Sequence, residues 1–246
     1  MRELLNRTNR ILIGGHRGCI CRYPENSIAA MEHGLLMGAD YLEIDIQLTK
    51  DGTAVVWHDT RLEKKTRLQG YVHEHTLEEL RGEAPGLCTF QEAMEWGRGR
   101  KAWFGLEIKT VPADMQEVNK RLMDTMVPLL RKCEMADRVF VFGADYQVLQ
   151  YLKRLAPEVE IGLIVPFVPP DPVGLMKSMD ALIYLSYIYN MTPEIIRNLQ
   201  ENDFYVSGAI LREDQWVRRA CEYGVNMFES DYPGEAKRFI DDATGF

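Results

Sequence analysis

The sequence predicts an α/β fold in which parallel strands alternate with helices. Two observations predict it. Short apolar runs of strand length recur along the 246 residues, and segments with helical periodicity or capping residues separate most of them. Strands that are joined through helices run parallel and are covered by those helices. The alternation alone leaves a closed barrel and an open doubly wound sheet, although no Gly-x-Gly-x-x-Gly follows the first strand to favour a dinucleotide-binding sheet.

Apolar runs, caps and turns define the elements of the N-terminal third. In order we expect a strand at residues 11–13, a helix capped by Asn26 or Ser27 that runs to Met37, a strand at 41–48, a turn at 50–53, a strand at 53–57 and a short helix at 76–81. Residues 41–48 alternate between apolar and polar side chains, as in a strand with two different faces. Because only a tight turn separates it from the next strand, the two strands can pair antiparallel.

The rest of the chain repeats strand and helix. We expect helices at residues 89–96, 113–132, 145–155, 192–201 and 213–223, and strands at 103–108, 139–142, 159–165, 182–185, 204–207 and 225–228. Thr89 and Glu92 form a capping box, and Pro193 suits the first turn after the cap Thr192. The four prolines of residues 166–172 indicate a loop, and no low-complexity linker divides the chain.

Length and composition favour one domain spanning residues 1–246, since single α/β barrels commonly have about 250 residues. The net charge of −8 leaves no basic field for nucleic acid or an anionic membrane. No apolar run is long enough for a signal peptide or an integral membrane segment, so we expect a cytoplasmic protein. Five cysteines without a Cys-x-x-Cys pair agree with a reducing compartment. The sequence leaves open whether the chain forms a homo-oligomer.

Carboxylates stand near the ends of two expected strands. Glu43 and Asp45 lie two residues apart on one strand and therefore point to the same side, about 7 Å from each other. Glu107 and Lys109 repeat this arrangement at the end of another strand. Three carboxylates at one end of a sheet repel one another unless a cation lies among them. Oxygen ligands favour Mg²⁺ or Ca²⁺ over zinc, whereas the alternative is that these residues pair on a solvated face.

Two histidines each follow a β-rich run. His16 and His58 could serve as general acid and general base near neutral pH, one activating a nucleophile and the other protonating a leaving oxygen. Arg17 offers a bidentate fork for a phosphate. Asp59 could orient a histidine.

Other candidate ligands are interpreted as structural. Cys19 and Cys21 flank the first histidine, but a zinc site usually needs a second pair nearby. His33 lies in an expected helix, and His73 and His75 lie in a polar loop.

Short motifs occur in a fixed order along the chain. They are Gly-His-Arg-Gly at residues 15–18, Pro-Glu-Asn-Ser at 24–27, Gly-Ala-Asp-Tyr-Leu-Glu-Ile-Asp at 38–45, Thr-Lys-Asp-Gly at 49–52, His-Asp at 58–59 and Glu-Ile-Lys at 107–109. This ordered set resembles the glycerophosphodiester phosphodiesterases. The resemblance continues at residues 76–80 and 224–233 and covers nearly the whole chain.

The resemblance implies a single-domain (β/α)₈ TIM barrel. It also implies metal-dependent hydrolysis of a small-molecule phosphodiester to an alcohol and glycerol 3-phosphate. The implied roles are metal ligands for Glu43, Asp45 and Glu107, acid and base for His16 and His58, and phosphate binding for Arg17 and Lys109, with Glu25 and Asp59 as further candidates.

The chain departs from the family pattern in the pocket wall. The segment after Leu80 is short, so we expect a shortened insertion at about residues 60–100. Residues 209–212, Ala-Ile-Leu-Arg, stand where Trp-Thr-Val-Asn is usual, and Glu229 stands where an apolar residue is usual. An inward Glu229 would add a hydroxyl acceptor, whereas a surface or helix-facing position is the alternative. The other functions left open are a phosphodiesterase or lyase acting on a sugar phosphodiester or lysophospholipid, and a non-catalytic barrel that binds phosphodiesters.

Overall fold

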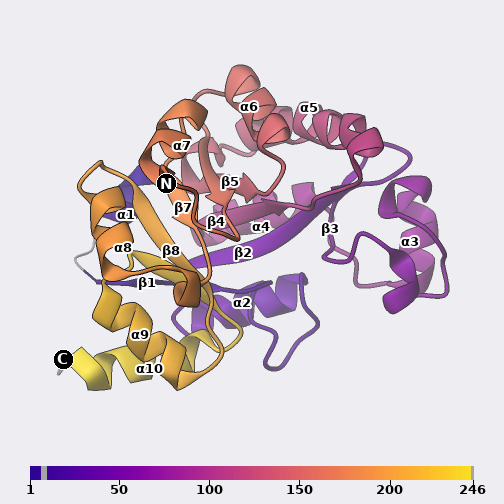
Figure 1. Cartoon of the computed structure of the whole chain (residues 1–246). Coiled ribbons are helices and arrows are strands. Elements are labelled where there is room, and N and C mark those ends of the chain that lie inside the picture. Colours follow the sequence, from indigo (N-terminus) through magenta and orange to yellow (C-terminus); the bar gives the residue numbers. More distant parts are fainter. Residues whose placement is uncertain (7–9, 245–246) are drawn as a thin grey trace.

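The strands form a closed barrel. The computed structural model describes residues 1–6 and 10–244, with side chains as far as Asp241. Within these residues eight parallel strands follow one another around the barrel: β1 (Leu12–Gly15), β2 (Tyr41–Leu48), β4 (Phe104–Ile108), β5 (Val139–Gly143), β6 (Glu160–Ile164), β7 (Ile183–Leu185), β8 (Tyr205–Ile210) and β9 (Met227–Ser230). Because β1 pairs with both β2 and β9, the sheet closes on itself (Figure 1). Closure excludes the open doubly wound sheet and confirms the predicted single-domain (β/α)₈ barrel.

One further strand, β3 (Ala54–Val56), lies outside the barrel. It pairs antiparallel with β2, with Val56 opposite Ile46, so the predicted hairpin is confirmed. The turn is fixed by Gly52, whose φ of 79° favours glycine, and by a hydrogen bond from the Thr53 N–H to the Thr49 hydroxyl. The hairpin leads the chain back toward the C-terminal ends of the barrel strands, where His58 follows.

Helices surround the barrel, as Figure 1 shows. They are α1 (Arg2–Asn6), α2 (Ile28–Leu36), α3 (Leu77–Glu83), α4 (Phe90–Arg100), α5 (Gln116–Lys132), α6 (Tyr146–Leu155), α7 (Pro172–Met179), α8 (Pro193–Gln200), α9 (Asp214–Tyr223) and α10 (Pro233–Thr244). Helices α1, α7 and α10 are not among those predicted from the sequence. In the described part of the chain, none of the helices is both long enough and apolar enough to cross a membrane.

Predicted caps start α2, α4 and α8, the last at Thr192. Ser27, and not Asn26, caps α2, since its hydroxyl accepts the N–H of Ala30. The capping box of Thr89 and Glu92 is present at α4. The helix expected from residue 113 begins at Gln116, because residues 113–115 form a 3₁₀ turn after a proline.

Inward-facing side chains fill the barrel below its C-terminal end. Tyr41 and Phe140 form one buried cluster with Met1 and with Leu4 of α1, and this helix packs against the N-terminal ends of the strands. The Tyr41 ring fits because β1 has Gly14 beside it, where a Cβ atom would lie 2.5 Å from the ring. Side chains on the outer face of the strands pack against the helices in a second, larger cluster.

The segment at residues 57–88 has a small core of its own. Its Leu62, Val72, Leu80 and Leu87 are buried together with Val55 of β3, and the segment includes α3 and two 3₁₀ turns. Figure 1 shows α3 on the side of the molecule beyond β3. The shortened insertion at about residues 60–100 stays a prediction.

Candidate active site

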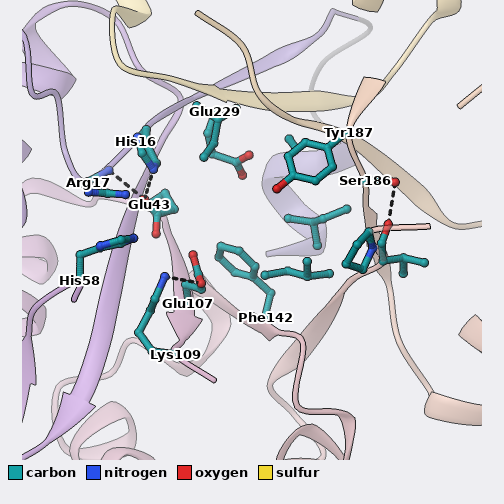
Figure 2. A pocket seen from close by; sticks show the side chains of 16 residues that line it. His16, Arg17, Glu43, His58, Glu107, Lys109, Phe142, Ser186, Tyr187 and Glu229 are labelled. Carbon is teal, nitrogen blue, oxygen red and sulfur yellow. Dashed lines mark hydrogen bonds and ion pairs between the residues drawn. The ribbon is translucent and has the colours of Figure 1, made fainter. Parts of the chain in front are cut away.

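A pocket of about 240 Å³ opens at the C-terminal ends of the barrel strands. One half is charged and is lined by His16, Arg17, Glu43, His58, Glu107 and Lys109. The other half is mainly apolar and is lined by Phe142, Ile164, Val165, Pro166, Leu185, Ser186, Tyr187, Ala209, Ile210 and Glu229 (Figure 2). Six of the nine candidate residues from the sequence therefore line one pocket, at the end of the barrel where active sites form in this fold.

Three of the candidate carboxylates converge beside the charged half. Asp45 on β2 lies opposite Glu107 on β4 in the strand register, and Glu43 is two residues before Asp45. One oxygen from each of the three lies within 4.8 Å of the others. Burial, together with the neighbouring charges of Asp45 and Glu107, raises the pKa of Glu43 well above its ordinary value. The arrangement concentrates negative charge at one place. Because Glu43 is buried, water does not stabilise its share of that charge.

Lys109 compensates two of these carboxylates. Its Nζ donates to Glu107 Oε1 at 2.6 Å and lies 3.2 Å from Asp45 Oδ1. Burial lowers the pKa of Lys109, but the two carboxylates outweigh burial and raise it above its ordinary value. Burial also raises the pKa of Glu107, although Lys109 opposes this shift.

The loop after β1 is folded tightly onto β2. Arg17 has a φ of 52°, and its backbone N–H donates to Glu43 Oε2 at 2.8 Å. Gly18, with a φ of 90°, donates its N–H to the carbonyls of Gly15 and Glu43. A Cβ at Gly15 would lie 1.9 Å from the Gly18 oxygen, so the turn needs glycine there. The loop thus holds Arg17 next to the carboxylates.

Asn26 anchors Asp45 and was not among the candidates from the sequence. Its Nδ2 donates to Asp45 Oδ2 at 2.7 Å, and its Oδ1 accepts the Asp45 N–H at 3.2 Å. Its φ of 58° is one that asparagine tolerates better than most residues. The Pro-Glu-Asn-Ser motif contained this residue, but its partner could be identified only in three dimensions.

His16 is held by Asp231, a residue that is not among the candidates from the sequence. Its Nδ1 lies 2.5 Å from Asp231 Oδ1, and its Nε2 lies 3.9 Å from Glu43 Oε2. Arg212 Nε donates to the other Asp231 oxygen at 2.6 Å. Burial raises the pKa of Asp231, but the hydrogen bonds from His16 and Arg212 outweigh it and lower the pKa. Asp231 therefore remains a carboxylate that turns Nε2 of His16 toward the pocket.

His58 enters the pocket from the segment after β3. Its Nδ1 lies 3.1 Å from Asp59 Oδ1, in agreement with the idea that Asp59 orients a histidine. Burial, and then the positive charges of Lys109 and Arg17, lower the pKa of His58 although Asp45 opposes them. The imidazole of His58 is thus biased toward its neutral form.

Glu25 and Asp59 lie outside the pocket lining. Glu25 accepts a hydrogen bond from the Arg17 guanidinium at 2.7 Å and another from Lys65. Asp59 lies 3.4 Å from the same lysine and 3.3 Å from Lys64. Both carboxylates therefore support pocket residues, Arg17 and His58, from behind.

The cysteines after the first motif form a group beside the pocket. The Sγ atoms of Cys19 and Cys21 are 3.0 Å apart, and His33 lies close enough for all three to approach one ion. Burial raises the pKa of Cys19 to about 12, and its thiol donates to the Asp231 carbonyl at 3.6 Å. A neutral, hydrogen-bonded thiol agrees with the structural interpretation of Cys19.

Comparisons with known proteins agree with the fold and the motifs. The family model described as the glycerophosphoryl diester phosphodiesterase family matches residues 16–235. A glycerophosphodiester phosphodiesterase of Bacillus altitudinis is 27% identical over 94% of this chain and 98% of its own. One of Caldanaerobacter subterraneus subsp. tengcongensis is 26% identical over 91% and 95%. The solved structure of an Oleispira antarctica phosphodiesterase in complex with the product sn-glycerol-3-phosphate has a TM-score of 0.86 and 21% identity, covering 94% of this chain and 96% of that one.

Proposed function

The chain belongs to the glycerophosphoryl diester phosphodiesterase family, and on that premise we propose that it hydrolyses a glycerophosphodiester to an alcohol and glycerol 3-phosphate. The observation that carries the proposal is the composition of the pocket. Two histidines backed by carboxylates, two cations and a group of buried carboxylates meet at the C-terminal end of one barrel. These are the groups that cleavage of an anionic phosphodiester requires.

We propose that Glu43, Asp45 and Glu107 hold a divalent ion. Glu43 Oε1 is buried and has no hydrogen-bond partner among the described residues. A buried oxygen without a donor is available to bind a cation. The all-oxygen donor set fits Mg²⁺ or Ca²⁺. When bound, such an ion supplies charge neutralisation and polarisation of a phosphate oxygen.

The side chains of the pocket account for the proton transfers. His16 and His58 each have Nδ1 beside a carboxylate, which leaves Nε2 to act on the substrate. One Nε2 takes the proton of the attacking hydroxyl, the bond from phosphorus to the alcohol oxygen breaks, and the other Nε2 protonates that oxygen. Arg17 and Lys109 offset the negative charge of the phosphoryl group. Water and a neighbouring substrate hydroxyl are the two nucleophiles that fit, the second giving a cyclic phosphate first.

A substrate other than a simple glycerophosphodiester is the second candidate. The apolar half of the pocket includes Pro166, Ile210 and Tyr187, and Tyr187 is 45% exposed. These side chains would suit a lysophospholipid chain, whereas the small Ala209 leaves room for a sugar. A non-catalytic barrel is disfavoured because every proposed catalytic position carries a chemically competent side chain.

The test is hydrolysis of a panel of phosphodiesters followed by ³¹P NMR. The panel contains glycerophosphocholine, glycerophosphoglycerol, a sugar phosphodiester and a lysophosphatidylcholine, each with Mg²⁺, with Ca²⁺ and with chelator. We expect glycerol 3-phosphate from the glycerophosphodiesters, and a transient cyclic phosphate signal would identify the substrate hydroxyl as nucleophile. Turnover of none of the four with either metal would refute the proposed activity.

A further inference from the structure

Glu229 is a buried carboxylate that the proposed mechanism does not use. It is 3% exposed and lies on β9, and it is one of the residues that line the pocket. Figure 2 shows that the Glu229 side chain extends from β9 into the pocket. Phe142 and Tyr187 border the same space, on the side of the pocket away from His58. The inward position anticipated as one alternative is therefore the one that the fold adopts.

Hydroxyl groups of the barrel interior satisfy only part of this carboxylate. The Tyr41 hydroxyl donates to Glu229 Oε1 at 2.7 Å, and the Ser207 hydroxyl donates to Oε2 at 3.4 Å. A carboxylate can accept about four hydrogen bonds. Among the described residues no lysine, arginine or histidine forms an ion pair with Glu229, so its remaining acceptor positions face the pocket without a cation.

A purely structural role does not account for a carboxylate at this position. A neutral amide could accept the Tyr41 hydroxyl equally well and would avoid the cost of burying a charge. Burial raises the pKa of Glu229 to about 7, with a smaller contribution from Glu107, which reflects that cost. A donor supplied by a bound ligand would relieve it.

The position of Glu229 indicates what that ligand offers. Within the mainly apolar half, Glu229 lies on the side next to the charged half, where the phosphate would bind (Figure 2). Strand β8 bulges beside it at Ala209, where φ is 61°. A substrate with its phosphate in the charged half of the pocket would pass Glu229 where it extends toward the apolar half. A second cation there would compete with the divalent ion proposed nearby, whereas a hydroxyl would not.

We propose that Glu229 is a specificity-determining residue whose carboxylate accepts a hydrogen bond from a hydroxyl group of the phosphodiester substrate. The inference rests on the proposed function. The hydroxyl can belong to the glycerol half or to the alcohol half, and the experiment separates these two sources.

The experiment compares two substrate pairs that differ only in hydroxyl groups. Glycerophosphoglycerol and glycerophosphopropanol differ in the alcohol half, while glycerophosphocholine and 3-hydroxypropyl phosphocholine differ in the glycerol half. In the wild type, kcat/KM should favour the hydroxyl-bearing member of one pair by about tenfold or more, since a site built to bind a hydroxyl rejects an analogue without it. The pair that shows the preference identifies the half that Glu229 contacts.

Two variants of Glu229 and one control test the assignment. Glu229→Leu should reduce this preference to within about threefold by lowering kcat/KM for the hydroxyl-bearing substrate, and Glu229→Gln should have an intermediate effect because its carbonyl still accepts a hydrogen bond. Glu78→Gln, an exposed substitution on α3 outside the pocket lining, serves as the control and should leave the preference intact. Thermal unfolding of each variant verifies folding, and Glu229→Gln keeps the test valid if Glu229→Leu does not fold.

The outcomes are separable. Equal loss on all four substrates would assign Glu229 a structural role and overturn the inference, as would a preference that survives in both Glu229 variants. A loss confined to the choline substrates, in equal measure for both, would indicate recognition of a cation and would also overturn it. A wild type that hydrolyses none of the four would remove the proposed function and this inference together.

Discussion

Replacing Glu43 by glutamine should stabilise the metal-free protein while it destroys the metal site. Glu43 accepts the backbone N–H of Arg17 at 2.8 Å, but Lys109 contacts Asp45 and Glu107 and leaves Glu43 uncompensated. A glutamine keeps an acceptor for that N–H and adds an amide that can donate to a neighbouring carboxylate. Removing the charge therefore removes repulsion at little cost in hydrogen bonding.

The magnitude follows from distance and from proton linkage. Two unit charges within 4.8 Å repel by about 3.5 kcal/mol at an effective dielectric constant of about 20. Because the pKa of Glu43 is raised in the folded state, its penalty is absent below the ordinary value of 4.5 and grows as the pH rises toward the folded pKa. At 1.36 kcal/mol per pH unit, the limit at pH 7 is about 3.4 kcal/mol. We expect a gain of about 1–3 kcal/mol at pH 7, or about 2–12 °C in Tm.

The assay is thermal and urea unfolding in chelator at pH 5 and pH 7, then with Mg²⁺ or Ca²⁺. Wild type should gain about 2.7 kcal/mol at a metal concentration one hundred times Kd, and Glu43→Gln should gain much less. Glu78→Gln, an exposed substitution on α3, serves as the matched control and should behave like wild type. A Glu43→Gln protein that is less stable than wild type in chelator at pH 7, or whose advantage is the same at both pH values, would refute the charge-repulsion argument.

Three further predictions concern activity. Chelator should abolish hydrolysis and Mg²⁺ or Ca²⁺ should restore it, so full turnover in excess chelator would contradict the carboxylate assignment. His16→Ala and His58→Ala should each lower kcat by about 10²-fold or more while the proteins remain folded. His33→Ala is the control and should change kcat little. A near wild-type rate in the His16 or His58 variant would exclude the replaced histidine from proton transfer. Ala209→Trp should shift kcat/KM toward glycerophosphocholine relative to a bulkier sugar phosphodiester by offering an aromatic face. An unchanged ratio in an enzyme that already prefers glycerophosphocholine would contradict the idea that the small Ala209 leaves room for a sugar.

Local signals explain which parts of the site could be predicted from the sequence. The alternation along β2 and the short run of β4 oriented the carboxylates correctly, because a strand determines which side chains share a face. The motifs that carry the histidines and Arg17 identified the rest of the charged half. The alternation of strands and helices does not indicate that the barrel closes, because closure depends on the pairing of β1 with β9. The prediction of a closed barrel came from the family resemblance.

Long-range partners explain what the sequence did not reveal. Asp231 is 215 positions from His16, and nothing in either local segment indicates their hydrogen bond. The start of α7 was hidden because Pro172 follows a proline-rich loop, although Asp171 caps the helix by accepting the Gly174 N–H. The sequence also left the direction of the Glu229 side chain open, because its hydrogen-bond partner, the Tyr41 hydroxyl, lies across the barrel.

Hydrogen bonds attach the loop after β1 to β2 and β9, the two strands beside β1. They hold the residues proposed for the chemistry independently of the apolar wall of the pocket. The His16 N–H donates to the Ser230 carbonyl of β9, and the backbone N–H groups of Arg17 and Gly18 donate to Glu43 of β2. One histidine, the arginine proposed to bind the phosphate and a proposed metal ligand thus share a single hydrogen-bonded frame. Ala209 lies on the opposite wall and is not part of that frame. Substitutions on that wall should therefore change which substrate is accepted while the proton transfers and the metal ligands keep their geometry.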